Sequence, residues 1–381
     1  MGSASRLISF RESLLRWFRA HRRDLPWRRT RDPYRIWLAE IMLQQTRVAA
    51  VIPFYERFLD RLPSIQALAA APESEVLRLW SGLGYYTRAR NLHRAAREIV
   101  SRFKGRFPTT PEEALSLPGI GRYTAAAVLS MACGEPLAVL DGNVARVLAR
   151  LGAVRGDLRS PRRWDELQRR AQLLLAPESP GEWNQAMMEL GATVCTPRRP
   201  SCRLCPLARF CRTRARGLTS AIPGKRRKLA PVRIEVAAAL LLDPGGRTLL
   251  LRPDLSRDAD RQGGAGELAR VFSRLWQFPA VVVRGKARPK ESAARTALRT
   301  HLRGPLGLPE VARLPCTPLE AARHSVTFRQ ITLRPYLYHV PRIPRLPGAR
   351  FAPLGDLGHL PVSGATRKLA RLALAELSAR A

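Results

Sequence analysis

The sequence has no apolar run of about 18 residues, the length that a helix needs to cross a bilayer. Residues 1–11 lack the apolar core of a secretory signal, and Arg6 stands where a myristoylation motif requires Ser or Thr. We therefore expect neither a membrane span nor a lipid anchor, and we expect a cytoplasmic protein.

Acidic residues are also scarce. The 381 residues include 30 Asp and Glu against 66 Lys and Arg, which gives a formal net charge of +36. An excess of this size favours a nucleic acid as partner, with an anionic membrane surface as the weaker alternative. Hydrophobic residues make up 45% of the chain, enough for sizeable cores, so wholesale disorder is excluded and two or three domains are expected.

Cysteine is rare, yet four of the six cysteines stand close together with the spacing C-x6-C-x2-C-x5-C, at Cys195, Cys202, Cys205 and Cys211. Four thiolates so spaced can surround one metal centre, which suits a reducing compartment. On spacing alone, a structural zinc ion and an iron–sulfur cluster remain equally compatible. The arginines that flank the cysteines make this a cationic loop suited to a polyanion such as DNA.

The hydrophobic pattern divides the chain. Apolar residues recur at helical spacing from residue 6 to about residue 215, as in Leu7, Phe10, Leu14 and Trp17. Beyond a basic stretch, strand patterns follow at 234–242, 248–251, 278–283 and 327–340, with helices at 291–302 and 366–377. We predict an all-α domain over 1–216, a basic linker over 217–231 and an α+β domain over 232–381.

A helix–turn–helix pattern spans residues 117–124, with the sequence Leu-Pro-Gly-Ile-Gly-Arg-Tyr-Thr. Gly119 and Gly121 permit close backbone approach, and the second helix begins with free N–H groups, so the turn can bind a DNA phosphate without reading sequence. An ordinary connection between two helices is the alternative.

Two carboxyl groups are candidates for chemistry. Asp141 directly precedes a helix, where its ionised form is stabilised, although a plain helix cap has the same pattern. Glu40 shares a helix face with Ile36, Trp37 and Leu43, and an apolar face raises the pKa of a carboxyl group and suits it to donate a proton. A solvated helical glutamate is the alternative reading.

Polar amides and aromatic rings occur near these positions. Residues 44–46, Gln-Gln-Thr, follow one turn after Glu40, and Tyr85 lies in the turn at residues 82–86. Such side chains can fill a gap in a base stack, although aromatic residues near a helix end are more commonly part of a core.

Together these segments resemble MutY-type adenine DNA glycosylases of the endonuclease III, or helix-hairpin-helix, superfamily. The segments that carry the resemblance are residues 24–28, 32–46, 82–86, 117–124, 140–144 and 183–211. The resemblance implies a helix-hairpin-helix glycosylase domain and a 4Fe–4S cluster on the four cysteines. It also implies a monomer, associated with the nucleoid, that removes adenine mispaired with 8-oxoguanine or guanine from double-stranded DNA.

The resemblance also implies roles for single residues. Glu40 corresponds to the acid that protonates adenine N7, Asp141 to the group that stabilises or attacks the oxocarbenium sugar, and Asn143 to its support. Tyr123 stands where related lyases carry a Schiff-base lysine; because a phenol cannot form an imine, strand cleavage should be weak. Positions that hold adenine are Arg23, Arg28 and Gln185, and positions that contact DNA are Gln44, Gln45, Thr46, Tyr85, Gly119, Gly121 and Thr124.

The C-terminal domain resembles the Nudix-like module of this family. Residues 275–279 match Leu-Trp-Glu-Phe-Pro, with Gln277 in place of Glu, and residues 291–302 lack the acidic core that holds divalent metal in Nudix hydrolases. Val326, Thr327 and Phe328 align with the loop that reads 8-oxoguanine, without the usual histidine, which puts strong lesion discrimination in doubt.

Three other functions compete. An endonuclease III-like glycosylase and lyase for oxidised pyrimidines is disfavoured by Tyr123 and by the extra domain. The pairing of Glu40 with Asp141 disfavours a non-catalytic iron–sulfur DNA sensor, and the missing acidic core disfavours a nucleotide pyrophosphatase.

Overall fold

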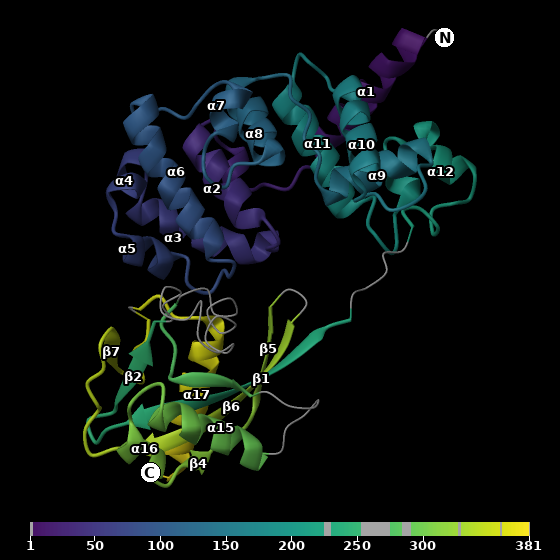
Figure 1. The fold of residues 1–381 in the computed structure, drawn as a ribbon. Coiled ribbons are helices and arrows are strands. Elements are labelled where there is room, and N and C mark those ends of the chain that lie inside the picture. The colour runs from purple at the N-terminus through teal and green to yellow at the C-terminus, as the bar shows by residue number, and fades with distance from the viewer. Residues whose placement is uncertain are drawn as a thin grey trace. The chain divides into compact units, whose positions relative to one another are not determined.

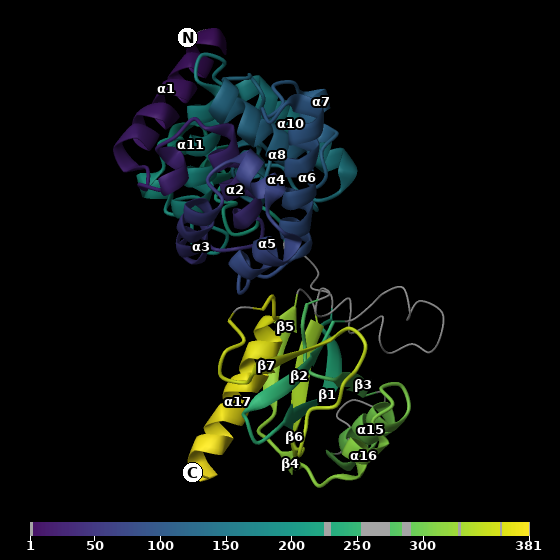
Figure 2. The ribbon, with the colours of Figure 1, turned by 90° about the vertical axis from the view of Figure 1, so that its left-hand side faces the viewer.

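The structure, a computed structural model, describes residues 3–224, 230–252, 275–283, 291–326, 329–358 and 360–380. The chain forms two compact units (Figures 1 and 2), one made of Met1–Ala71 and Arg90–Arg227, the other of Pro72–Ala89 and Lys228–Ala381. None of the helices in these ranges has the length and apolar character that crossing a membrane requires.

The first unit is helical, as the periodicity predicts. Its helices are α1 (Ser3–His21), α2 (Pro33–Leu43), α3 (Val48–Arg61), α4 (Ile65–Ala70), most of α6 (Thr87–Phe103), α7 (Pro111–Leu115), α8 (Arg122–Val128), α9 (Gly142–Gly152), α10 (Pro161–Leu174), α11 (Pro180–Thr193) and α12 (Arg212–Ala215). One core of this unit joins apolar side chains of α1, α9, α10 and α11.

Helix α2 is the buried helix that carries Glu40. The carboxylate of Asp32 caps it by accepting a hydrogen bond from the Tyr34 N–H (2.8 Å), and Pro33 occupies the first turn, where no N–H is needed. Residues 36–42 of this helix are all buried, so its apolar residues pack on every side. A polar side chain on α2 therefore lies in an apolar environment.

The turn between α7 and α8 has the expected helix–turn–helix form. Gly119 adopts a φ of +80°, and a Cβ there would come within 2.6 Å of the Asn91 Cβ, so this position needs glycine. Gly121 is the N-terminal cap of α8, and its side-chain position is open. The first N–H groups of α8 therefore lie next to an unobstructed turn.

The packing of α11 against α9 also depends on a glycine. A Cβ on Gly191 would come within 2.8 Å of the Asn143 Cβ and 3.1 Å of the Asn143 carbonyl oxygen. The absence of a side chain at Gly191 thus allows α11 to approach the first turn of α9 closely, where Asp141 and Asn143 lie.

The second unit contains a mixed sheet formed by β1 (Val232–Leu242), β2 (Arg247–Leu251), β3 (Ala280–Val283), β4 (Thr317–Pro318), β5 (Ala322–Val326), β6 (Arg329–His339) and β7 (Ala349–Pro353). The strand order is β4-β6-β1-β2-β7; β3 pairs with β1, and β5 with β6. Strands β1 and β6 are parallel, with Val232 opposite Arg329.

Helices cover both faces of this sheet (Figure 2): α17 (Gly364–Arg380) on one face, α15 (Glu291–Arg303) and α16 (Pro309–Arg313) on the other. Alternate residues of β1 therefore enter two different cores, Ile234 and Val236 with α17, Ala237 and Ala239 with α15. Burial on both faces explains the continuous apolar run in β1.

The predicted strands and helices of this unit agree with the structure to within a few residues, whereas the sequence patterns do not predict β4, β5, β7 and α16. The Gly-rich segment at 257–267 and part of the basic linker at 217–231 lie outside the described residues. Residues 72–89, with α5 (Glu73–Leu79) and Tyr85, belong to the second unit, whereas the sequence pattern places them in the helical domain.

Candidate active site

One cavity in the first unit brings together residues from distant parts of the sequence. Its volume is about 480 Å³. Ten residues singled out from the sequence line it: Arg23, Arg28, Glu40, Gln44, Gln45, Thr46, Tyr123, Asp141, Asn143 and Gln185. The tertiary structure thus places Glu40 and Asp141 in the same cavity, which their spacing along the chain could not establish.

Glu40 is 4% exposed, and its surroundings in the cavity make its carboxyl group a weaker acid than an ordinary glutamate. Burial, aided by the nearby negative charge of Asp141, raises the pKa of Glu40 to about 7, and the hydrogen bond from Tyr123 and the charge of Arg28 only partly oppose this. Near neutral pH a large fraction of Glu40 is therefore protonated, as its apolar helix face predicts.

Asp141 is surrounded by N–H donors. Its Oδ1 accepts hydrogen bonds from the backbone N–H groups of Asn143 (3.0 Å) and Val144 (2.7 Å), and its Oδ2 accepts one from the Asn143 side-chain amide (3.0 Å). Burial raises the pKa of Asp141 despite these donors, which favour the ionised form. Asp141 is the N-terminal cap of α9 and also lines the cavity.

Tyr123 on α8 contacts Glu40 directly. Its hydroxyl donates to Glu40 Oε2 (2.7 Å) and lies 3.3 Å from the sulfur of Met188. Burial and the carboxyl groups of Glu40 and Asp141 raise the pKa of Tyr123 well above its ordinary value. The phenol is therefore neutral and fixes the orientation of the Glu40 carboxyl group.

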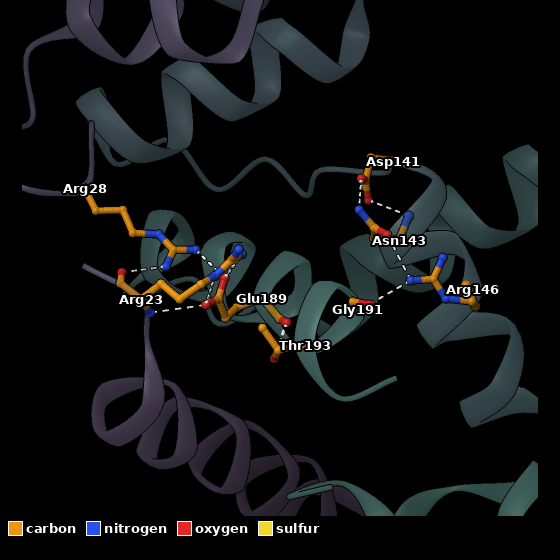
Figure 3. Close-up of polar contacts among 8 residues, drawn as sticks. All are labelled: Arg23, Arg28, Asp141, Asn143, Arg146, Glu189, Gly191 and Thr193. Carbon is orange, nitrogen blue, oxygen red and sulfur yellow. Dashed lines mark hydrogen bonds and ion pairs between the residues drawn. The ribbon is translucent and has the colours of Figure 1, made fainter. Parts of the chain in front are cut away.

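Arg23 and Arg28 converge on Glu189 (Figure 3), a residue that the sequence analysis did not single out. Arg23 binds both carboxylate oxygens of Glu189 (2.7 Å each), and Arg28 Nη2 donates to Oε2 (2.8 Å). Burial alone would raise the pKa of Glu189, but these two guanidinium groups outweigh it and lower the pKa to about 2. Helical spacing could have identified Glu189, since it follows Gln185 by four residues on α11.

A buried arginine joins the first turn of α9 to the cysteine loop. Arg146 donates from Nη2 to Asn143 Oδ1 (2.9 Å) and to the Gly191 carbonyl (2.7 Å), as Figure 3 shows, and from Nε to the Cys195 carbonyl (2.9 Å). Because Asn143 in turn donates to Asp141, a continuous chain of hydrogen bonds runs from Cys195 to Asp141.

The four cysteines of the loop, Cys195, Cys202, Cys205 and Cys211, line one small cavity of about 30 Å³ with almost wholly apolar walls. Arg150 Nη1 lies 3.3 Å from Cys195 Sγ, and the Arg214 backbone N–H lies 3.5 Å from Cys211 Sγ. Within the described ranges, no group of three or more His, Cys, Asp or Glu side chains is arranged to hold a single metal ion. Four soft sulfur ligands around one cavity fit a metal–sulfur cluster.

The residues expected to contact DNA divide between the units. Thr124 accepts a hydrogen bond from Gln44 (3.4 Å), and Gln45 has the left-handed φ of +60° at the end of α2. Tyr85, in the second unit, is 38% exposed and has a φ of +51°. Non-glycine residues in this backbone region are uncommon and cluster at functional sites.

Only part of the expected lesion-reading loop can be placed. Val326 ends β5 opposite Arg329 of β6, whereas Thr327 and Phe328 lie outside the described residues.

Comparison with known proteins identifies relatives of the whole chain. Residues 38–172 match the family described as HhH-GPD superfamily base excision DNA repair protein. The adenine DNA glycosylases of Rattus norvegicus and Mus musculus are 35% and 36% identical over 96% of this chain and 78% of their own length. The structure of a thermostable thymine-DNA glycosylase, 30% identical, covers 57% of this chain and 100% of its own, with a TM-score of 0.52.

Replacing Glu189 tests the energy of the two-arginine contact. A carboxyl group with a lowered pKa contributes stability above its unfolded pKa and loses it as the pH falls, here from about 4.5 toward about 2. We expect Glu189→Gln to lower the free energy of unfolding at pH 7 by about 3 kcal/mol, since about 1.4 kcal/mol corresponds to each pKa unit. Urea denaturation followed by circular dichroism measures this.

Glu182→Gln is the matched control, because Glu182 also lies on α11 and pairs with an arginine, Arg19, whose side chain is 61% exposed. An exposed ion pair contributes only about 0–1 kcal/mol, so this variant should change little. Equal losses in the two variants would contradict the assigned strength of the Glu189 contact.

Proposed function

The chain belongs to the family of adenine DNA glycosylases, and we propose that it removes adenine mispaired with 8-oxoguanine or guanine from double-stranded DNA. The family relation makes it an adenine-specific DNA N-glycosylase of base excision repair. The observation that carries the mechanism is the presence, in one cavity, of a carboxyl group with a pKa of about 7 and a carboxylate held by three N–H donors.

The reaction begins when adenine is turned out of the base stack into the cavity, because its glycosidic bond cannot be reached inside the duplex. The side chains of Arg23, Arg28 and Gln185 lie on the cavity wall and are suited to hold the base, and Glu189 fixes the two guanidinium groups. Pairing with a buried carboxylate leaves these arginines little conformational freedom, so the binding surface is preorganised.

Glu40 acts as the general acid. Since Tyr123 donates to Oε2, Oε1 is the oxygen free to carry the proton to adenine N7. Protonation makes adenine a neutral leaving group that takes the electrons of the bond between sugar C1′ and base nitrogen N9. A carboxyl group with a pKa near the working pH is effective in this step because it is both protonated and acidic enough.

Asp141 faces the positive charge that develops on the sugar. Its carboxylate stabilises the oxocarbenium ion or attacks C1′ to form a transient adduct, and water completes the hydrolysis. Asn143 holds Asp141 in place through two hydrogen bonds. Tyr123 supplies no amine for a Schiff base, so the enzyme is monofunctional and leaves an abasic site with the strand intact.

The cysteine loop holds a 4Fe–4S cluster in our proposal. Cys195, Cys202, Cys205 and Cys211 would bind it through their sulfur atoms, as their common apolar cavity permits. When bound, the cluster fixes the shape of the loop and supplies no step of base removal. The loop's arginines then present a cationic surface to the DNA phosphates.

Three further proposals concern the substrate and its surroundings. The residues around the α7–α8 turn bind phosphate, while Gln45 and Tyr85 enter the duplex. The C-terminal unit acts as a Nudix-like module whose residues 326–328 contact 8-oxoguanine. The enzyme acts as a monomer in the cytoplasm, where its net charge favours association with the nucleoid.

Glu40→Gln tests the acid. We expect adenine release from a mispaired duplex to fall by at least about a hundredfold, since general acid catalysis contributes about that much or more, while DNA binding persists. In the wild type, the single-turnover rate should fall as the pH rises through about 7, because Glu40 loses its proton. Glu98→Gln, which alters an exposed ion pair with Arg102, is the control. A Glu40→Gln rate near that of the wild type would remove Glu40 from the mechanism.

A duplex panel tests the mispair preference. Adenine release opposite 8-oxoguanine, guanine and thymine is measured under single turnover, with alkaline treatment to reveal abasic sites. We expect fast release opposite 8-oxoguanine, slower release opposite guanine and none opposite thymine. Equal rates for the first two would separate the chemistry from lesion reading by residues 326–328, and strand cleavage without alkali would contradict monofunctional hydrolysis.

Cys202→Ser tests the cluster. Loss of one of four thiolate ligands should abolish the brown chromophore of the protein and weaken DNA binding, because the loop is no longer held. Cys133→Ser, at an exposed cysteine outside the loop, should keep both. A colourless wild-type protein that contains zinc would refute the iron–sulfur assignment.

A further inference from the structure

A second large cavity lies in the first unit, away from the active site. It is an open groove of about 540 Å³ between α1, the C-terminal ends of α9 and α10, and the cysteine loop. These elements gather at one end of the unit (Figure 1). None of the residues that line the groove lines the cavity of Glu40, so adenine removal does not account for it.

The floor of the groove is apolar. Leu7, Phe10, Leu148 and Phe210 line it, and the rings of Phe10 and Phe210 pack edge to face with their centroids 5.3 Å apart. Leu173 also lines the groove, with 73% of its surface exposed. Exposed apolar surface gathered in a concave site is typical of a binding surface.

The rim of the groove is cationic. Arg6, Arg170 and Arg212 line it beside the apolar residues. Arg170 forms an ion pair with Glu166 (2.7 Å), whereas Arg6 and Arg212 form none among the described residues. An apolar floor with two exposed, unneutralised guanidinium groups complements a ligand that carries both apolar and acidic groups.

We propose that this groove is the docking site for an acidic, amphipathic helical segment of a partner protein. Apolar side chains on one face of the segment would enter the groove, and its carboxylates would meet Arg6 and Arg212. The apolar floor does not suit a DNA backbone, which is bound through charge and hydrogen bonds. A second copy of the chain is also disfavoured, because each copy carries a net charge of +36.

A segment docked in the groove would contact both the cysteine loop and α1. Phe210 stands in the cysteine loop, immediately before Cys211, and Leu7 and Phe10 stand on α1. The loop and α1 are already tied together, since Arg209 Nη2 donates to Ser9 Oγ (2.6 Å) and Ser13 Oγ (3.2 Å). These hydrogen bonds connect two sides of the groove to each other.

The probe is a fluorescein-labelled helical peptide with leucine on one face and glutamate on the other, followed by fluorescence anisotropy on the full-length protein. We expect Leu173→Asp to weaken binding about tenfold, since it places a negative charge in the groove and removes apolar surface. Leu204→Asp is the matched control: Leu204 is also a leucine with 73% exposure, but it lies outside the groove. Arg6→Glu is a second variant that should weaken binding through the rim.

Adenine release by Leu173→Asp should stay within about twofold of the wild-type rate, because the groove is separate from the catalytic cavity. The proposal is overturned if the wild type does not bind the peptide, or if Leu173→Asp and Leu204→Asp weaken binding equally. Equal binding of a peptide with the same composition in scrambled order would also overturn it. Displacement of the peptide by undamaged duplex DNA would assign the groove to DNA.

Discussion

The capping of α9 by Asp141 is the interaction on which most of the first unit depends. The same carboxylate that caps the helix lines the cavity of Glu40, so the position of the helix also fixes the position of this carboxylate. Two buried arginines of this helix, Arg146 and Arg150, bind carbonyl oxygens of the cysteine loop. Helix α9 thus connects the cavity, the loop and the core formed with α1 and α11.

The two carboxyl groups of the cavity differ because their surroundings compensate burial differently. Asp141 has three N–H donors at a helix N-terminus, which suit an anion, whereas Glu40 has a single hydroxyl donor in an apolar helix. Glu189 represents a third case, in which two guanidinium groups lower the pKa far below its ordinary value. Three carboxyl side chains that line one cavity therefore differ in pKa because their hydrogen-bond partners differ.

Hydrogen bonds that offset the cost of burying a charge explain why several charged groups can lie in one cavity. Burying Glu189 alone would be costly, but each of its oxygens accepts a hydrogen bond from an arginine. The same hydrogen bonds hold the two arginine side chains in place. Glu40 is the group left with little compensation, and burial raises its pKa to about 7.

Local patterns in the sequence predicted the helices of the first unit, strands β1, β2, β3 and β6 of the second unit and the α7–α8 turn, because hydrophobic period, proline and glycine act over a few residues. They also predicted the raised pKa of Glu40 from its apolar helix face. They did not predict β4, β5, β7 or α16. Glu189 was missed, since a glutamate on a helix is usually solvated. Its spacing from Gln185 places it on the same helix face, but the sequence does not indicate that Arg23 and Arg28 bind it. The chain from Cys195 through Arg146 to Asp141 was missed for the same reason. The sequence by itself determined which groups were available; only the tertiary structure decided which of them meet and lose their water, and that determines their pKa values and their roles.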